Sequence, residues 1–178
     1  MTPDVIQRAA EYARQAHASI DQRRKFTGQP YIIHPEAVAK LTASVTNDPA
    51  MIAAAWLHDV VEDTPVTLQQ IQTEFGDDIA ALVDDLTKVA QPSDGDRQVR
   101  GEMNKRHTAQ ASPRAKTVKL ADVIDNLSDL ANAPQDFVKR FASEKESLLE
   151  VLTEGDPTLY AKAEEAIQAA KERLAGSK

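Results

Sequence analysis

The feature that most constrains the fold is a helix-start signal that recurs along the whole chain. Each copy is a helix-capping side chain followed directly by proline, and the copies are Thr2–Pro3, Asp48–Pro49, Ser112–Pro113 and Asp156–Pro157. Proline suits the first helical position because its missing N–H has no intrahelical partner there. Aromatic residues make up only 4% of the chain, which does not favour sheet. These signals predict an all-α fold.

Apolar residues recur with helical spacing between these signals, and no strand-like alternation persists. We expect helices at about 3–19, 35–46, 49–63, 67–75, 77–89, 97–110, 113–131, 134–153 and 157–174. Thr67 and Gln70 form a capping box for one of them, and Gly76 ends it. No repeat, low-complexity stretch or linker interrupts the chain. We therefore predict a single compact domain of about nine helices over 1–178, with the motif-bearing core at about 13–130 and C-terminal helices at 134–174.

The chain has no cysteine and a formal net charge of −7. Disulfides, thiolate metal sites and cysteine nucleophiles are therefore excluded, and nucleic-acid binding is not expected. No signal peptide is apparent, and the longest apolar run, Met51–Leu57, is far shorter than the roughly 20 residues that cross a bilayer. We expect a soluble, cytoplasmic protein without membrane contact. The sequence does not indicate an oligomeric state.

Positive charge is nevertheless concentrated in two segments. One is Arg23, Arg24 and Lys25, and the other runs from 97 to 119, where Glu102 is the single acid among many basic residues. Local positive patches on an acidic protein suit a small, highly anionic ligand. The alternative for either segment is an ordinary solvated helix face.

The helix expected at 49–63, PAMIAAAWLHDVVED, ends in a dense cluster of chemical groups. Its first two turns are apolar on every side, which predicts a buried helix. His58, Asp59, Glu62 and Asp63 then share one arc of about 140°, because successive residues are about 100° apart. Such charges on a buried helix repel each other and lose hydration unless a cation, such as a divalent metal ion, pairs with them. The alternative is a helix end that emerges into water.

A metal site needs more ligands than one His–Asp pair, and two other segments supply candidates. His34 lies in QPYIIHP, and Asp122 lies among apolar residues in KTVKLADVIDN. Asn126 shares the face of Asp122, whereas Asp125 points aside and could be a solvent-side carboxylate. The candidate ligand set is His34, His58, Asp59 and Asp122. Two imidazoles with two carboxylates suit Mn²⁺, Fe²⁺ or Zn²⁺ more than Ca²⁺.

Four motifs together resemble the hydrolase domain of Rel/SpoT-type enzymes, in order and in spacing. They are RRKFTGQPYIIHP, AAAWLHDVVEDT, FGDDIAALVDDLTK and KTVKLADVIDN. The order H…HD…D is the ligand pattern of the HD phosphohydrolase superfamily, and the likeness runs from about Ala13 to Leu130. The length leaves no room for a synthetase domain, and KRHTAQASPRAKTVKLAD is typical of short forms. The chain is thus similar to small alarmone hydrolases, which remove pyrophosphate from (p)ppGpp.

The resemblance implies a role for each matching residue. His34, His58, Asp59 and Asp122 become the metal ligands, with Mn²⁺ as the usual ion. Glu62 and Asp63 handle the attacking water and its proton. The implied substrate-binding residues are Arg24, Lys25, Tyr31 and Asn126, with core packing as the alternative for Tyr31. VIDN stands where long Rel proteins have RLHN, which bears on substrate contacts.

Three other basic residues are weaker candidates for a role in the site. Lys105 and Arg106, in the second basic segment, are candidates for offsetting phosphate charge, with a wet helix face as the alternative. His17 lies among alanines in the first helix, where we expect packing or capping.

The expected reaction is hydrolysis of the 3′-pyrophosphate of a guanosine alarmone, which yields GDP or GTP and pyrophosphate. This makes a small-molecule nucleotide the expected ligand. One alternative is an HD phosphohydrolase that acts on another nucleotide, such as (p)ppApp. Another is a catalytically inactive nucleotide-binding module or a purely structural bundle. The presence of both Glu62 and Asp63 does not favour the inactive form.

Overall fold

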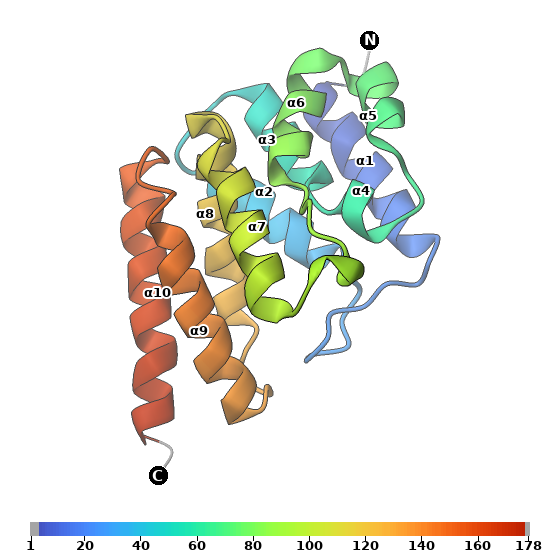
Figure 1. Cartoon of the computed structure of the whole chain (residues 1–178). Helices are drawn as coiled ribbons and strands as arrows, with labels where there is room; N and C mark the ends of the chain where they lie inside the picture. Colours follow the sequence, from blue (N-terminus) through green and yellow to red (C-terminus); the bar gives the residue numbers. More distant parts are fainter. Residues whose placement is uncertain (1–3, 177–178) are drawn as a thin grey trace.

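The computed structural model describes residues 4–176, and these form a bundle of helices without any strand (Figure 1). The helices are α1 (Val5–Ala18), α2 (Ile33–Ala43), α3 (Pro49–Leu57), α4 (Val60–Asp63), α5 (Leu68–Phe75), α6 (Asp77–Leu86), α7 (Arg97–Ala109), α8 (Pro113–Ser128), α9 (Gln135–Leu149) and α10 (Pro157–Gly176). A 3₁₀ turn, η1, covers Pro92–Asp94. The all-α class predicted from the sequence is confirmed.

The helix-start signals act as the sequence predicts. Asp48, Ser112 and Asp156 each accept a hydrogen bond from a backbone N–H in the first turn of the following helix. The capping box at Thr67 also forms. The Thr2–Pro3 pair lies outside the described residues. Because these caps depend on residues close in sequence, they could be recognised without knowledge of the fold.

The segment expected as one helix over 49–63 is broken, and there the prediction was wrong. α3 ends at Leu57 and α4 begins at Val60. Asp59, in the break, has φ −105° and ψ −1°, which departs from α-helical geometry. The ring of His58 donates from Nδ1 to the carbonyl oxygen of Ala55 at 2.7 Å, and so takes an acceptor of the last turn of α3. The break turns His58 and Asp59 away from a straight helical path.

Two buried helices form the centre of the bundle and position the site. α3 packs against α1, α2 and α6, and α8 packs against α2 and α10. Nearly all of α3 is buried, as the sequence predicts, and α8 buries a long apolar face. Any group at the end of α3 or in the middle of α8 is therefore held by a packed core.

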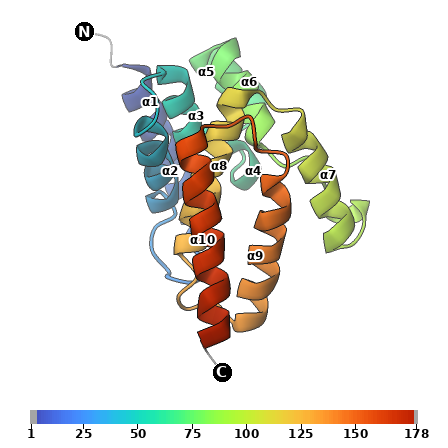
Figure 2. The ribbon, with the colours of Figure 1, turned by 90° about the vertical axis from the view of Figure 1, so that its left-hand side faces the viewer.

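The C-terminal helices α9 and α10 pack side by side, and α10 also covers α8 (Figure 2). Figure 2 shows α7 at the outer edge of the bundle, and none of its side chains is buried. Within residues 4–176, no helix is both long enough and apolar enough to cross a membrane.

Candidate metal centre and its cavity

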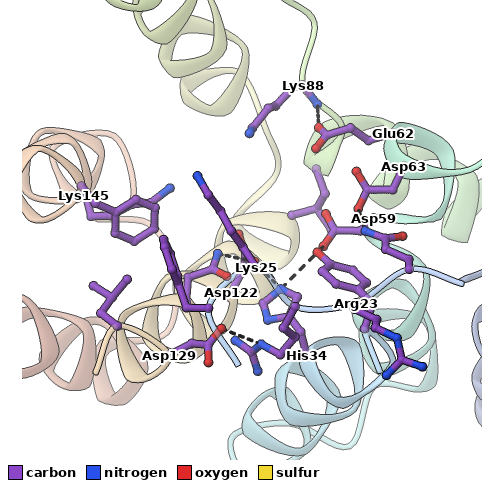
Figure 3. Close-up of a pocket in the computed structure, with 18 of the residues that line it drawn as sticks. Arg23, Lys25, His34, Asp59, Glu62, Asp63, Lys88, Asp122, Asp129 and Lys145 are labelled. Carbon is purple, nitrogen blue, oxygen red and sulfur yellow. Dashed lines mark hydrogen bonds and ion pairs between the residues drawn. The ribbon is translucent and has the colours of Figure 1, made fainter. Parts of the chain in front are cut away.

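The four candidate ligands converge from three parts of the chain, and Figure 3 shows three of them, His34, Asp59 and Asp122, at the cavity. His34 lies in the first turn of α2, His58 and Asp59 lie in the break between α3 and α4, and Asp122 lies in the middle of α8. One ligand atom from each residue lies within 4.8 Å of the others. His34 Nε2 is 2.9 Å from Asp122 Oδ1 and 3.2 Å from His58 Nε2. The arrangement is one that could hold a metal ion.

Both imidazoles turn the same nitrogen toward this group. His58 Nδ1 donates to the Ala55 carbonyl oxygen at 2.7 Å, and His34 Nδ1 lies 2.6 Å from Asp125 Oδ2. Since a carbonyl or carboxylate oxygen only accepts, each Nδ1 carries a hydrogen, which leaves Nε2 as the nitrogen of each ring that can bind a metal ion. The interpretation of Asp125 as a solvent-side carboxylate was therefore wrong.

The electrostatics of the group favour a cation at its centre. Burial opposes ionisation of Asp122, but Lys119 and the two histidines hold the pKa of its carboxyl well below the ordinary value. Burial likewise opposes the charged form of His58, but Asp59 and Asp122 raise its pKa well above the ordinary value. The two carboxylates thus draw protons onto the imidazoles. A metal ion that binds such ligands displaces those protons, and two nitrogens with two oxygens suit a divalent transition metal.

Asp63 lies beside this group and is poised to bind a proton near neutral pH. Burial and the charge of Asp59 raise its pKa to about 6. Gln22 Nε2 donates to Asp63 Oδ2 at 3.0 Å, and Gln22 Oε1 lies 2.8 Å from His17 Nδ1. His17 is 1% exposed. It is a packed residue, as expected, and it also holds the amide that orients Asp63.

Glu62 and Tyr31 flank the group on other sides. Glu62 is exposed, and its Oε1 accepts from the backbone N–H of Lys88 at 3.2 Å. The Tyr31 hydroxyl donates to Asp59 Oδ2 at 2.5 Å. Burial and the charge of Asp59 raise the pKa of this hydroxyl, which therefore stays protonated. Tyr31 lines the cavity while it orients a candidate ligand.

A cavity of about 390 Å³ opens over the candidate ligands. One side is apolar and is formed by Phe26, Leu130, Phe137 and Phe141. Lys88, Lys119 and Lys145 approach the cavity from the loop after α6, from α8 and from α9. Sequence reasoning missed these lysines as site residues, because Lys88 and Lys145 lie outside both basic segments, and nothing in the sequence separates Lys119 from the rest of the second one.

Lys145 lies close to other positive charges. Burial and the charges of Lys119 and Lys88 lower its pKa to about 8. Its ammonium lies 4.8 Å from the centre of the Phe141 ring. Among the described residues, neither Lys88 nor Lys145 has a carboxylate partner for its ammonium. An anionic ligand would supply the missing negative charge.

Three residues of the implied substrate-binding set also line this cavity. Arg24 is 8% exposed and forms ion pairs with Asp125 at 3.1 Å and with Asp129 at 2.9 Å. Lys25 is exposed and lies over the Phe137 ring. Asn126 Nδ2 donates to Asp122 Oδ1 at 3.1 Å. Lys25 is thus accessible to a ligand in the cavity, whereas the guanidinium of Arg24 is occupied by its two ion pairs.

The structure does not bring Lys105 and Arg106 to the candidate ligands. Lys105 lines a neighbouring cavity of about 780 Å³, where its ammonium bonds to Ser147 and pairs with Glu150. Arg106 is exposed and is not among the residues that line either cavity. Both lie on α7, which faces solvent.

Comparison with known proteins identifies a family and several relatives. The HD-domain family matches residues 9–154. A probable GTP pyrophosphokinase of Mycobacterium leprae is 40% identical over 141 residues, which cover 79% of this chain and 18% of that protein. The chain thus spans about a fifth of the length of its long curated relatives.

Two shorter relatives match over most of their length. The 3′-pyrophosphohydrolase MESH1 of Xenopus tropicalis is 37% identical over 129 residues, which cover 71% of this chain and 69% of that protein. A solved structure of a metazoan ortholog of SpoT, described as hydrolysing ppGpp, has a TM-score of 0.84 at 29% identity. That match covers 95% of this chain and 97% of the other.

Proposed function

The chain belongs to the HD-domain family, and we propose that it is a guanosine-3′,5′-bis(diphosphate) 3′-pyrophosphohydrolase that requires a metal ion. The reaction converts (p)ppGpp and water into GDP or GTP and pyrophosphate. The observation that carries the proposal is the buried group of two histidines and two carboxylates with Asp63 beside it. The names of the short relatives support the choice of substrate. We also propose that the described chain acts as a single hydrolase domain.

We propose Mn²⁺ as the ion, held by His34, His58, Asp59 and Asp122. The mixed nitrogen and oxygen donors suit this ion, and both Nε2 atoms already face the site. When bound, such an ion lowers the pKa of a coordinated water and polarises an adjacent phosphoryl oxygen. The HD-domain family supports a divalent metal, while the choice of manganese rests on the resemblance.

Asp63 is the proposed general base. A base must be ionised at the working pH and still have appreciable proton affinity, and a pKa of about 6 meets both conditions. Gln22 holds one carboxylate oxygen, which leaves the other to accept the proton of the attacking water. Glu62 is exposed and accepts a hydrogen bond from the backbone N–H of Lys88. We therefore place it at the mouth of the site and do not assign it the role of general base.

The rest of the cavity suits a nucleotide with several phosphates. We propose that the nucleoside lies against Phe26, Phe137 and Phe141, and that Lys25 and Asn126 contact it or its phosphates. Lys88, Lys119 and Lys145 offset phosphate charge that develops near the metal. Lys105 and Arg106 are not needed in this arrangement. Arg24 contributes by holding its loop against α8.

The test is pyrophosphate release from ppGpp, with Mn²⁺ and with excess chelator. We expect release by the wild type only with Mn²⁺, and a loss of at least about 100-fold for Asp59→Ala and for Asp63→Asn. Glu164→Gln changes the same kind of charge on an exposed part of α10 and should behave as the wild type. Circular dichroism of each variant checks that the fold is retained.

Other substrates give the outcomes that contradict the proposal. Turnover of pppApp without turnover of ppGpp would retain the metal centre and overturn the guanosine substrate. Tight binding of ppGpp with no Mn²⁺-dependent release would favour an inactive nucleotide-binding module.

A further inference from the structure

We infer that Asp125 is a positioning residue that fixes the tautomer and the orientation of His34, so that Nε2 is available to the metal ion. The inference rests on the metal centre of the proposed function. Its basis is the 2.6 Å contact between His34 Nδ1 and Asp125 Oδ2. Both side chains are sheltered, with exposures of 2% for His34 and 12% for Asp125.

The tautomer of His34 decides whether the site can take a cation. A neutral imidazole carries its hydrogen on either Nδ1 or Nε2. If the hydrogen were on Nε2, that atom would donate to Asp122 Oδ1, 2.9 Å away, and would have no lone pair for a metal. Because the Asp125 carboxylate only accepts, it holds the hydrogen on Nδ1. Asp125 thus keeps the metal-facing nitrogen free.

The other histidine of the site is fixed by a different device. His58 Nδ1 donates to the backbone oxygen of Ala55 within the last turn of α3, so its tautomer follows from the helix itself. His34 has no such acceptor in its own helix, and its second contact comes from α8. His34 therefore depends on a side chain that substitution can remove. Loss of such an outer contact typically lowers metal affinity or activity by about 10–100-fold.

Arg24 keeps the Asp125 carboxylate in place. Its guanidinium pairs with Asp125 at 3.1 Å and with Asp129, the residue that follows α8, at 2.9 Å. Without a counter-ion, a sheltered carboxylate against an imidazole would be costly to hold. The backbone of Arg24 also bonds to Gln29 and Gly28, and so anchors the loop that leads into α2. Arg24 thus links this loop, Asp125 and His34.

A merely structural role for Asp125, as one of two carboxylates that hold Arg24, predicts a different result. Asp125 and Asp129 both pair with Arg24, but only Asp125 contacts His34. Asp125→Asn and Asp129→Asn therefore form a matched pair, in which each removes one ion pair of Arg24. If the role were structural alone, both substitutions would have equal effects. Positioning of His34 predicts an effect on metal binding from Asp125 only.

The experiment is Mn²⁺ titration of the full chain by calorimetry, without nucleotide. We expect Asp125→Ala to weaken Mn²⁺ binding by about 10–100-fold. Asp125→Asn should lie between that variant and the wild type, because an amide oxygen still accepts but has no charge. Asp129→Asn should stay within about threefold of the wild type. Equal losses for Asp125→Asn and Asp129→Asn, or no loss for Asp125→Ala, would overturn the inference.

A second readout separates this inference from the proposed function. In the metal-free protein, at a pH high enough for the imidazole to be neutral, ¹⁵N shifts of the ring report which nitrogen of His34 carries the hydrogen. We expect the Nδ1–H form in the wild type and in Asp129→Asn, and a mixture of both forms in Asp125→Ala. A wild type that binds no Mn²⁺ would contradict the proposed metal centre, while the tautomer would still decide the role of Asp125. An unchanged tautomer in Asp125→Ala would overturn that role whatever the activity on ppGpp.

Discussion

Asp63→Asn should stabilise the metal-free protein at neutral pH while it removes the proposed base. The Asp63 carboxylate lies partly buried beside Asp59, and burial together with that charge raises its pKa to about 6. Asparagine has nearly the same shape, and its Oδ1 can still accept the hydrogen bond from Gln22 Nε2. The substitution therefore removes a charge and little else.

The magnitude follows from the pKa of Asp63 in the two states. The ordinary value is 3.8 and the folded value is about 6, and a difference of about 2.2 pH units corresponds to roughly 3 kcal/mol. Partial exposure screens the interaction, so we expect about 1–2 kcal/mol. Because the folded protein binds this proton more tightly than the unfolded chain, wild-type stability falls as pH rises from about 4 to about 6. The variant lacks this contribution to the fall.

Thermal unfolding with excess chelator, from pH 4.5 to pH 8, measures this effect. The variant should melt about 2–8 °C above the wild type at pH 8, and the gap should shrink toward pH 4.5. Glu164→Gln is the control, because Glu164 is exposed on α10 and is not among the groups that raise the pKa of Asp63. A gap of the same size at every pH, or a variant less stable at pH 8, would refute the claim that Asp63 is held ionised against its neighbours.

Two further substitutions probe the cavity and the core. Lys145→Met should raise KM for ppGpp about tenfold and weaken the dependence of KM on salt, because it removes one charge from a positive cluster that faces the cavity. Steady-state kinetics at two ionic strengths measure both effects. An unchanged KM would place the phosphates elsewhere. Gly155→Ala should lower the free energy of unfolding by about 1–3 kcal/mol, because its Cβ would lie 2.6 Å from Leu120 Cδ1 and 3.2 Å from the Leu152 carbonyl oxygen. Gly101→Ala, in the open helix α7 with no atom within 4 Å of the new Cβ, should instead be neutral or stabilising in the same denaturant titration.

Sequence reasoning recovered most of the fold because helix signals are local. The caps at Asp48, Ser112 and Asp156 bond to residues two or three positions away, and the all-apolar start of α3 is visible in the chain itself. The break after Leu57 was missed, because it accompanies a hydrogen bond from the His58 ring to the main-chain oxygen of Ala55 at a buried site. Helical periodicity does not report such a contact.

The grouping of the candidate ligands could be predicted for a related reason. His58 and Asp59 are adjacent, and Asp122 is a charged residue in an apolar stretch, so each is conspicuous in the sequence. The structure places all of them with His34 inside one group. Asp125 was misread because its direction was judged from its own helix. The partners of Asp125 come from α2 and from the loop before it, which no spacing within α8 reveals.

The positive charge of the site shows where such reasoning stops. The run from 97 to 119 is dense along the chain, yet Lys105 and Arg106 lie on α7, away from the candidate ligands. Lys88, Lys119 and Lys145 are far apart in sequence, yet they meet at one cavity because the loop after α6, α8 and α9 pack around it. Charge that is close along a helix is spread around its circumference, whereas charge that binds a compact anion must converge in space. A basic run therefore suits an anionic ligand without locating its site, and tertiary packing decides which lysines converge there, whether they lie in such a run, as Lys119 does, or outside it.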